Sequence, residues 1–135
     1  IESTTGSATG LALLPTRVDF HAEKTLGRPV GAWRGETVQG YEIHHGVVAV
    51  EGEAEPFLDG VRVGNTFGTI WHGAFENDGF RRAWLTEVAE AVGSDWRPTP
   101  GAPRFAQRRE QMLDELADTL ATHTDLDGLL DLATA

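Results

Sequence analysis

Cysteine is absent from the 135 residues, which excludes disulfides, thiolate metal ligands and a thiol nucleophile within the sequence. A chain without cysteine fits a reducing compartment, where disulfides are rare. No apolar run approaches the roughly 20 residues that a membrane-spanning helix needs. The sequence therefore predicts a cytoplasmic protein that does not enter a membrane.

Basic residues are also scarce, with 11 Lys and Arg against 21 Asp and Glu and a formal net charge of −10. Nucleic-acid binding depends on neutralising phosphates with Lys and Arg, and anionic membranes attract the same side chains. The composition disfavours both partners, and the acidity is most simply interpreted as a contribution to solubility. The length suits one domain or a portion of a larger one.

Several common catalytic and binding motifs are missing as well. There is no GxxxxGK[ST] or GxGxxG phosphate-binding loop, no GxSxG serine elbow, and no HxH or HExxH spacing. His44 and His45 are adjacent, so on a strand they would face opposite sides and could not share one metal ion. Because a metal site requires three or four converging ligands, no metal site is predicted.

The first half of the chain, up to residue 72, has short apolar runs separated by turn residues, a pattern typical of strands. The longest candidate, residues 36–52, should place Tyr41, Ile43 and His45 on one face and Glu42 and His44 on the other. Its alternation predicts antiparallel pairing with one face exposed. The other candidates are residues 10–15, a buried strand or turn; residues 16–24; and residues 61–73, with a turn or bulge at Gly64 and Asn65.

The second half is helical. A first helix is predicted from the spacing of Phe80, Trp84, Val88 and Val92, capped by Asn77 or Asp78 and closed by Gly93. A second helix is predicted over residues 105–122, with the apolar face Met112, Leu113, Leu116 and Leu120. A short third helix follows, with Thr124 as its cap. The two terminal helices should supply core and packing surface, and strands followed by helices predict an α/β fold with a mixed sheet.

One histidine, His72, ends an apolar run and is followed by Gly73 and a predicted helix. A strand end, a glycine and a helix start form a common setting for active-site groups in open α/β sheets. The spacing alone favours the other interpretation, a hydrogen-bonded structural histidine at a strand terminus, and both interpretations stay open at this point.

Four motifs occur in one order: "GLALLPTRVDFHAEKTL", "GYEIHHG", "FGTIWHGAFENDGFRRAWL" and "RREQMLDELADTLATHTDLDGLL". Together they resemble the C-terminal half of the glutamine amidotransferase domain in the cobyric acid synthase family, from about Glu2 to Leu132. The resemblance implies a flavodoxin-like, class I amidotransferase fold, of which residues 1–135 would be the C-terminal portion.

The resemblance also implies an activity. Family members use ATP and Mg in a synthetase domain, expected to be absent from this chain, and release ammonia from glutamine in the amidotransferase domain. The ammonia amidates the b, d, e and g carboxylates of adenosylcobyrinic acid a,c-diamide in cobalamin biosynthesis. The implied partners are glutamine, the corrin substrate and the N-terminal part of the same protein. Two alternatives stay open: a catalytically inert binding domain, and a sister amidotransferase acting on a different carboxylate substrate.

Site residues are carried over by motif. His72 matches the histidine that exchanges protons with a cysteine, and the cysteine is expected upstream of Ile1, so this chain alone should be inactive. Tyr41, Glu42 and His44 are predicted to bind substrate. Related enzymes carry His-Pro-Glu, whereas here Gly73 and Ala74 follow the histidine. The orienting acid is therefore open among Glu42, Glu76 and Asp78, with Glu76 preferred, and a dyad without a third member also fits.

Overall fold

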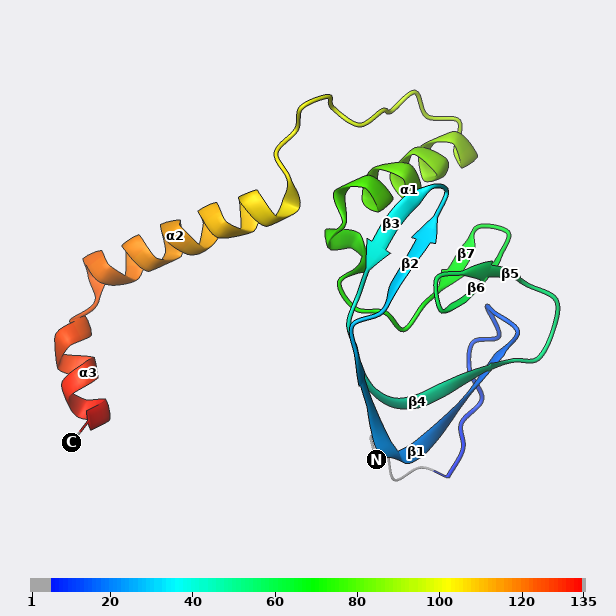
Figure 1. The fold of residues 1–135 in the computed structure, drawn as a ribbon, viewed down its shortest axis with the longest axis horizontal. Coiled ribbons are helices and arrows are strands. Elements are labelled where there is room, and N and C mark those ends of the chain that lie inside the picture. The colour runs from blue at the N-terminus through cyan, green and yellow to red at the C-terminus, as the bar shows by residue number, and fades with distance from the viewer. Residues whose placement is uncertain (1–5, 135) are drawn as a thin grey trace. The chain divides into compact units, whose positions relative to one another are not determined.

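The computed structural model describes residues 6–134. The chain divides into two compact units, and the boundary between them in the sequence falls between Pro98 and Thr99. The first unit contains the strands and one α-helix, and the second contains two helices (Figure 1). Residues 1–5 lie outside the described residues.

The elements of the first unit are β1 (Thr16–Gly27), β2 (Val30–Trp33), β3 (Glu36–Gln39), β4 (Glu42–Val50), β5 (Glu55–Phe57), β6 (Gly60–Val63), β7 (Thr66–Gly68), the 3₁₀ helix η1 (Ala74–Glu76) and α1 (Asp78–Ala91). The second unit holds α2 (Phe105–His123) and α3 (Leu126–Thr134). The α/β class is confirmed. In place of one mixed sheet, the described residues form three small antiparallel sheets, and the flavodoxin-like architecture stays a prediction.

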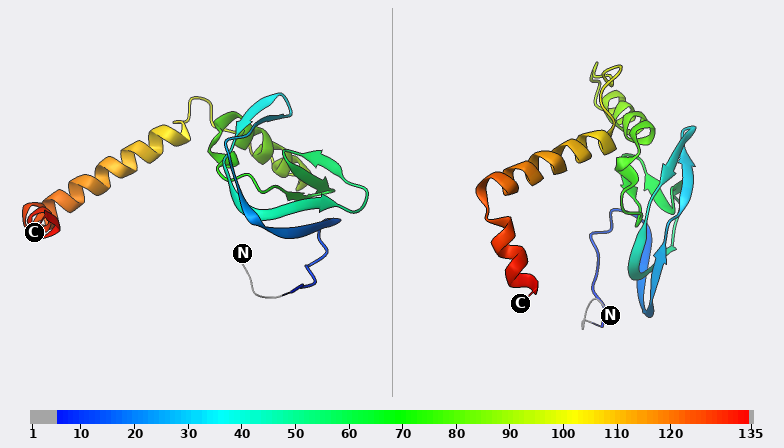
Figure 2. Two further views of the ribbon diagram at one scale, coloured as in Figure 1. Left: turned by 60° about the horizontal axis from the view of Figure 1, so that its bottom comes forward. Right: turned by 60° about the vertical axis from the view of Figure 1, so that its left-hand side comes forward.

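Two of these sheets, β1–β4 and β2–β3, together form one long antiparallel ribbon (Figures 1 and 2). The hairpin turns at Arg34 and Gly35, whose φ values of 48° and 81° suit the tight turn that matches strand twist. The predicted strand over residues 36–52 is wrong as a single element, because pairing is interrupted between β3 and β4. Its antiparallel pairing is confirmed, although the longest strand is β1.

The ribbon contains one irregularity. Phe20 pairs with Gly46 and Thr25 pairs with His44, so residues 21–24 of β1 stand opposite His45 alone. A bulge of this kind bends and twists a strand pair. The β1 strand itself was predicted from the sequence, but the bulge within it was not.

The third sheet is the meander β5–β6–β7. Its last turn contains Gly64, with a φ of 56°, and Asn65, as predicted. Gly60 begins β6 against β7, and a Cβ there would stand 2.2 Å from the carbonyl oxygen of Gly68. Only glycine fits this close approach of two backbones.

The core of the first unit lies between the β2–β3 hairpin, the β5–β7 meander and α1. Its buried cluster comprises Trp33, Val38, Phe57, Ala74 and Phe80. The predicted α1 is confirmed: it packs along β3, and the φ of 68° at Gly93 closes it. The apolar face is shorter than predicted, since Phe80 is fully buried and Val92 is 74% exposed.

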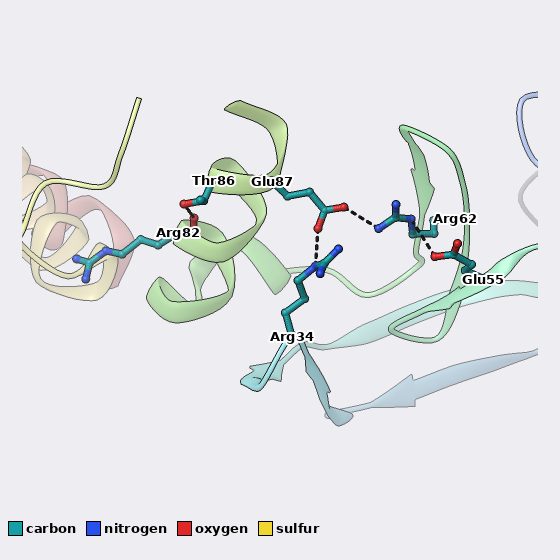
Figure 3. A network of polar contacts seen from close by, with 6 residues as sticks. All are labelled: Arg34, Glu55, Arg62, Arg82, Thr86 and Glu87. Carbon is teal, nitrogen blue, oxygen red and sulfur yellow. Dashed lines mark hydrogen bonds and ion pairs between the residues drawn. The ribbon is translucent and has the colours of Figure 1, made fainter. Parts of the chain in front are cut away.

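Ion pairs and hydrogen bonds between charged side chains link α1 to the strands (Figure 3). Glu87 accepts a hydrogen bond from Arg62 Nη1 at 2.6 Å and forms an ion pair with Arg34 Nε at 2.5 Å. The guanidinium of Arg62 also lies 5.0 Å from the ring centroid of Phe67. One half-buried carboxylate therefore links α1 to the hairpin turn and to β6.

Residues 10–15 form no strand, so the prediction of a buried strand is wrong, whereas the alternative of a turn agrees with the bend over residues 13–15. Leu11 is 87% exposed and Leu13 is 65% exposed. No strand among the described residues pairs with this segment, and its last residue, Pro15, accepts a hydrogen bond from the Glu51 N–H at 2.8 Å only where β1 is about to begin.

The second unit confirms the two terminal helices but not their burial. Within the second unit, none of the described residues of α2 or α3 is buried, so Met112, Leu113, Leu116 and Leu120 do not form the predicted core there. Thr124 does not cap α3 with its side chain; Asp125 Oδ1 accepts the Gly128 N–H at 3.0 Å instead. Across residues 6–134, no helix combines the length and hydropathy needed to cross a bilayer.

Candidate functional site

His72 lies beside the long ribbon as its partner in an isolated antiparallel bridge. The His72 N–H donates to the Tyr41 carbonyl at 2.9 Å, and the Tyr41 N–H donates to the His72 carbonyl at 3.0 Å. The two residues thus form a directly opposed pair, whose side chains emerge on the same face. The backbone of His72 is fixed at the break between β3 and β4, while its side chain is exposed.

Glycines on the ribbon make this bridge possible. A Cβ on Gly40 would stand 3.0 Å from Trp71 Cβ and 3.1 Å from the His72 carbonyl oxygen. A Cβ on Gly31 would stand 2.9 Å from the Trp71 ring. Trp71 therefore packs closely against the ribbon beside the core, and alternation along the chain turns His72 to the other side.

The rings of Tyr41 and His72 are stacked. Their centroids are 4.9 Å apart and their planes differ by 15°. Gly73 follows with a φ of 72°, and a Cβ there would touch the Tyr41 ring at 3.4 Å. The left-handed conformation at Gly73 turns the chain beneath the tyrosine and directs Ala74 into the core.

Asn77 ties this turn to the hairpin. Its Nδ2 donates to the Gln39 carbonyl at 2.7 Å and to the Ala74 carbonyl at 2.8 Å, and its Oδ1 accepts the Gln39 N–H at 3.1 Å. Asn77 does occupy the position before α1, but its side chain makes no helix-capping bond, which corrects the predicted role. The sequence signal for this position was therefore present but was assigned to the wrong interaction.

Two of the candidate orienting acids lie close to His72 in the chain. Glu76 is exposed in η1, its backbone N–H donates to the Gly73 carbonyl at 2.9 Å, and its Oε1 lies 3.8 Å from the position of a Gly73 Cβ. Asp78 instead pairs with Arg81 at the start of α1. Of these two acids, Glu76 has its carboxylate over the same turn as the imidazole.

Glu42 and His44 form a second group on one face of β4, as predicted. His44 Nε2 lies 3.8 Å from Glu42 Oε1, and His44 Nδ1 is 2.7 Å from the Gly46 carbonyl oxygen. The Glu42 carboxylate covers Gly27 on β1, with Oε2 2.8 Å from the position of a Cβ there. Alternation places this group on the opposite side of the ribbon from Tyr41.

The described residues show no arrangement suited to a metal. Within residues 6–134, no three His, Cys, Asp or Glu side chains converge as a ligand set would. A hollow between β7 and α1, lined by Phe67, Trp84 and Val88 among others, includes none of the predicted site residues. At the bridge to Tyr41, His72 presents an exposed imidazole, a group that can exchange protons, on a fixed backbone.

The comparison with known families identifies the class of domain. Residues 1–80 match the model for the CobB/CobQ-like glutamine amidotransferase domain, and the chain belongs to that family. The matched range contains His72, Tyr41, Glu42, His44 and Glu76. The second unit lies beyond it.

Individual relatives match almost the whole chain. It is 54% identical to a cobyric acid synthase of Cutibacterium acnes over 97% of this chain and 27% of the relative. It is 57% identical to a cobyric acid synthase of Streptomyces coelicolor over 96% of this chain and 25% of the relative. The chain thus spans about a quarter of the length of these relatives. No solved structure matches it significantly.

Proposed function

We propose that this chain is the histidine-bearing part of the glutaminase in a cobyric acid synthase. The observation that carries the proposal is the identity of 54% and 57% with two such enzymes over nearly the entire chain. The geometry supports it, because the motif histidine is exposed, sits on a braced turn and lies within the family match.

His72 is the proton-transfer group in this proposal. A cysteine thiolate from outside this chain attacks the glutamine amide carbon, and His72 takes up the thiol proton. His72 returns this proton to the amide nitrogen as the C–N bond breaks, so that ammonia leaves and a thioester remains. Water attacks the thioester carbon, its proton passes through His72 to the sulfur, and glutamate is released. An imidazole suits both directions of transfer because histidine titrates near neutrality.

The released ammonia converts the b, d, e and g carboxylates of adenosylcobyrinic acid a,c-diamide to amides. ATP and Mg supply the activation of those carboxylates. The described residues of this chain do not fit Mg, since they offer no converging ligand set. We therefore assign ATP and Mg to the synthetase portion of the longer protein, which would be the partner of this domain.

The remaining predicted residues lie at different positions relative to the imidazole in this proposal. Glu76 orients the imidazole, because its carboxylate lies over the turn that carries His72. Tyr41 is beside the imidazole and borders the same exposed surface. Glu42 and His44 contact each other across the ribbon from Tyr41, so they would contact substrate only from a different side.

The test uses the full-length protein that contains this chain. His72→Ala should lower glutamine-dependent amidation by at least about 100-fold, the usual lower bound for loss of a general acid–base group. Amidation with added ammonium should persist, because it bypasses glutamine hydrolysis. His123→Ala, at the end of α2 and outside the family match, is the matched control and should retain both activities.

Each contrary outcome has a distinct meaning. Retained glutamine hydrolysis in His72→Ala would remove this residue from the mechanism. A wild-type protein that hydrolyses no glutamine would be the inert binding domain. Amide formation on a carboxylate acceptor other than the corrin would identify a sister amidotransferase.

A further inference from the structure

We propose that Tyr41 is a positioning residue that sets the orientation of the His72 imidazole by ring stacking. The inference rests on the proposed function of His72. In it a neutral ring, in addition to the carboxylate that usually does so, orients the histidine. It assigns Tyr41 a role different from the substrate contact suggested by the sequence.

The two residues constrain each other at two levels. Their backbones exchange both hydrogen bonds of an antiparallel pair, at 2.9 and 3.0 Å, which fixes the separation of the two Cα atoms. Their rings are nearly parallel, with centroids 4.9 Å apart, within the range of favourable aromatic contacts. The backbone pair fixes the position of the His72 Cα atom, and the stacking restricts the rotation of the imidazole ring.

The surroundings make such a restraint necessary. His72 is exposed, and an exposed side chain exchanges among staggered rotamers unless a neighbour selects one. Neither neighbour of His72 in the chain restrains the imidazole, because Gly73 has no side chain and the Trp71 side chain packs against the core. Among the described aromatic contacts, Tyr41 is the ring that touches the imidazole.

Tyr41 is itself well held for this purpose. Gly40 precedes it, and a Cβ on Gly40 would stand only 3.1 Å from the His72 carbonyl oxygen. The two backbones therefore lie close together directly beside Tyr41. Tyr41 covers one face of the imidazole and remains 50% exposed. The exposed remainder of the histidine stays available to a thiol and to glutamine.

The test compares Tyr41→Phe with Tyr41→Leu in the full-length protein, measuring glutamate release. Phenylalanine keeps the stack and should retain wild-type kcat and KM. Leucine removes it and should lower kcat by about tenfold with KM unchanged, as expected for loss of an aromatic contact that orients a reacting group. Ile43→Ala is the matched control, since Ile43 lies on the same face of the ribbon and is 47% exposed.

A second readout does not depend on turnover. In the 135-residue chain, the ring current of Tyr41 should shift the His72 ring protons upfield in NMR spectra. The shift should persist in Tyr41→Phe and disappear in Tyr41→Leu.

The outcomes separate this inference from the proposed function. If His72→Ala removes glutamine hydrolysis while Tyr41→Leu matches wild type, the positioning role is wrong and the proposed function stands. A higher KM at constant kcat would make Tyr41 a substrate contact. Equal losses in Tyr41→Phe and Tyr41→Leu would place the effect in the hydroxyl, and an equal loss in Ile43→Ala would place it in general weakening of the ribbon. Each of these results overturns the inference.

Discussion

Asn77 hydrogen-bonds both backbone polar groups of Gln39, so the residue before α1 mimics a strand neighbour at the end of β3. The same amide reaches the Ala74 carbonyl. One side chain therefore fixes the distance between the hairpin and the turn that carries His72. The tightness of this turn depends on an interaction that is neither helix capping nor sheet pairing.

Asn77→Ala should lower the free energy of unfolding of the first unit by about 2 kcal/mol, because it leaves the polar groups of Gln39 with fewer partners. Urea denaturation followed by tryptophan fluorescence measures this. Asn65→Ala, at the exposed turn between β6 and β7, should change stability by less than about 0.5 kcal/mol. Equal effects of the two substitutions would show that the Asn77 amide does not brace the turn.

Gly40→Ala should be destabilising by about 1–3 kcal/mol, even though alanine is the better residue in an ordinary strand. Its methyl group would stand 3.1 Å from the His72 carbonyl oxygen and 3.0 Å from Trp71 Cβ. The amide of Tyr41 should then exchange with deuterium faster than in the wild type. Gly10→Ala has open space around its Cβ and is the control; unchanged protection of Tyr41 in Gly40→Ala would contradict the packing described here.

Glu87→Gln should weaken the first unit by about 1–3 kcal/mol, because it removes the charge shared by Arg34 and Arg62 in a half-buried setting. Glu90→Gln is the matched change on the same helix, where the pair with Arg97 is exposed, and should stay within about 0.5 kcal/mol. Chemical denaturation at low and high salt measures both. If Glu87→Gln lowers the free energy of unfolding no more than Glu90→Gln does, the interactions of Glu87 contribute only as much as an exposed ion pair.

Asp125→Ala should destabilise the start of α3 by about 1 kcal/mol, since it removes the oxygen that accepts the Gly128 N–H. Amide exchange across residues 126–134 should accelerate. Thr124→Ala is the control and should leave that exchange unchanged. The reverse ranking would restore Thr124 as the cap, as the sequence pattern first indicated.

The sequence predicted the helices well because their signals are local. The four-residue spacing from Phe80 onward and the glycine at 93 lie within one continuous segment, and α1 ends there. Strand pairing was harder. The turn at Arg34 and Gly35 lacks the usual Asn-Gly or Asp-Gly pattern, so the hairpin that joins β2 to β3 was not anticipated.

For the candidate site, too, the sequence indicated the features that depend on local signals and missed the contacts between distant segments. His72 stood out because its neighbours in sequence, Gly73 and the helix that follows, indicate a turn. Its spatial neighbour Tyr41 comes from a distant part of the chain, and no local pattern reports a bridge between them. Residues 10–15 illustrate the opposite error, since hydrophobicity alone suggested a buried strand where no strand forms and Leu11 and Leu13 are exposed.

The continuous ribbon also bears on the order in which the molecule assembles. Pairing can begin at the Trp33–Glu36 end and extend outward one residue pair at a time, since each new contact closes only a short additional loop. The bridge to His72 closes a much longer one and must wait until the hairpin exists. We therefore expect the turn that carries His72 to be among the last parts to form and the first to open, so that the proposed proton-transfer geometry would be a late product of folding.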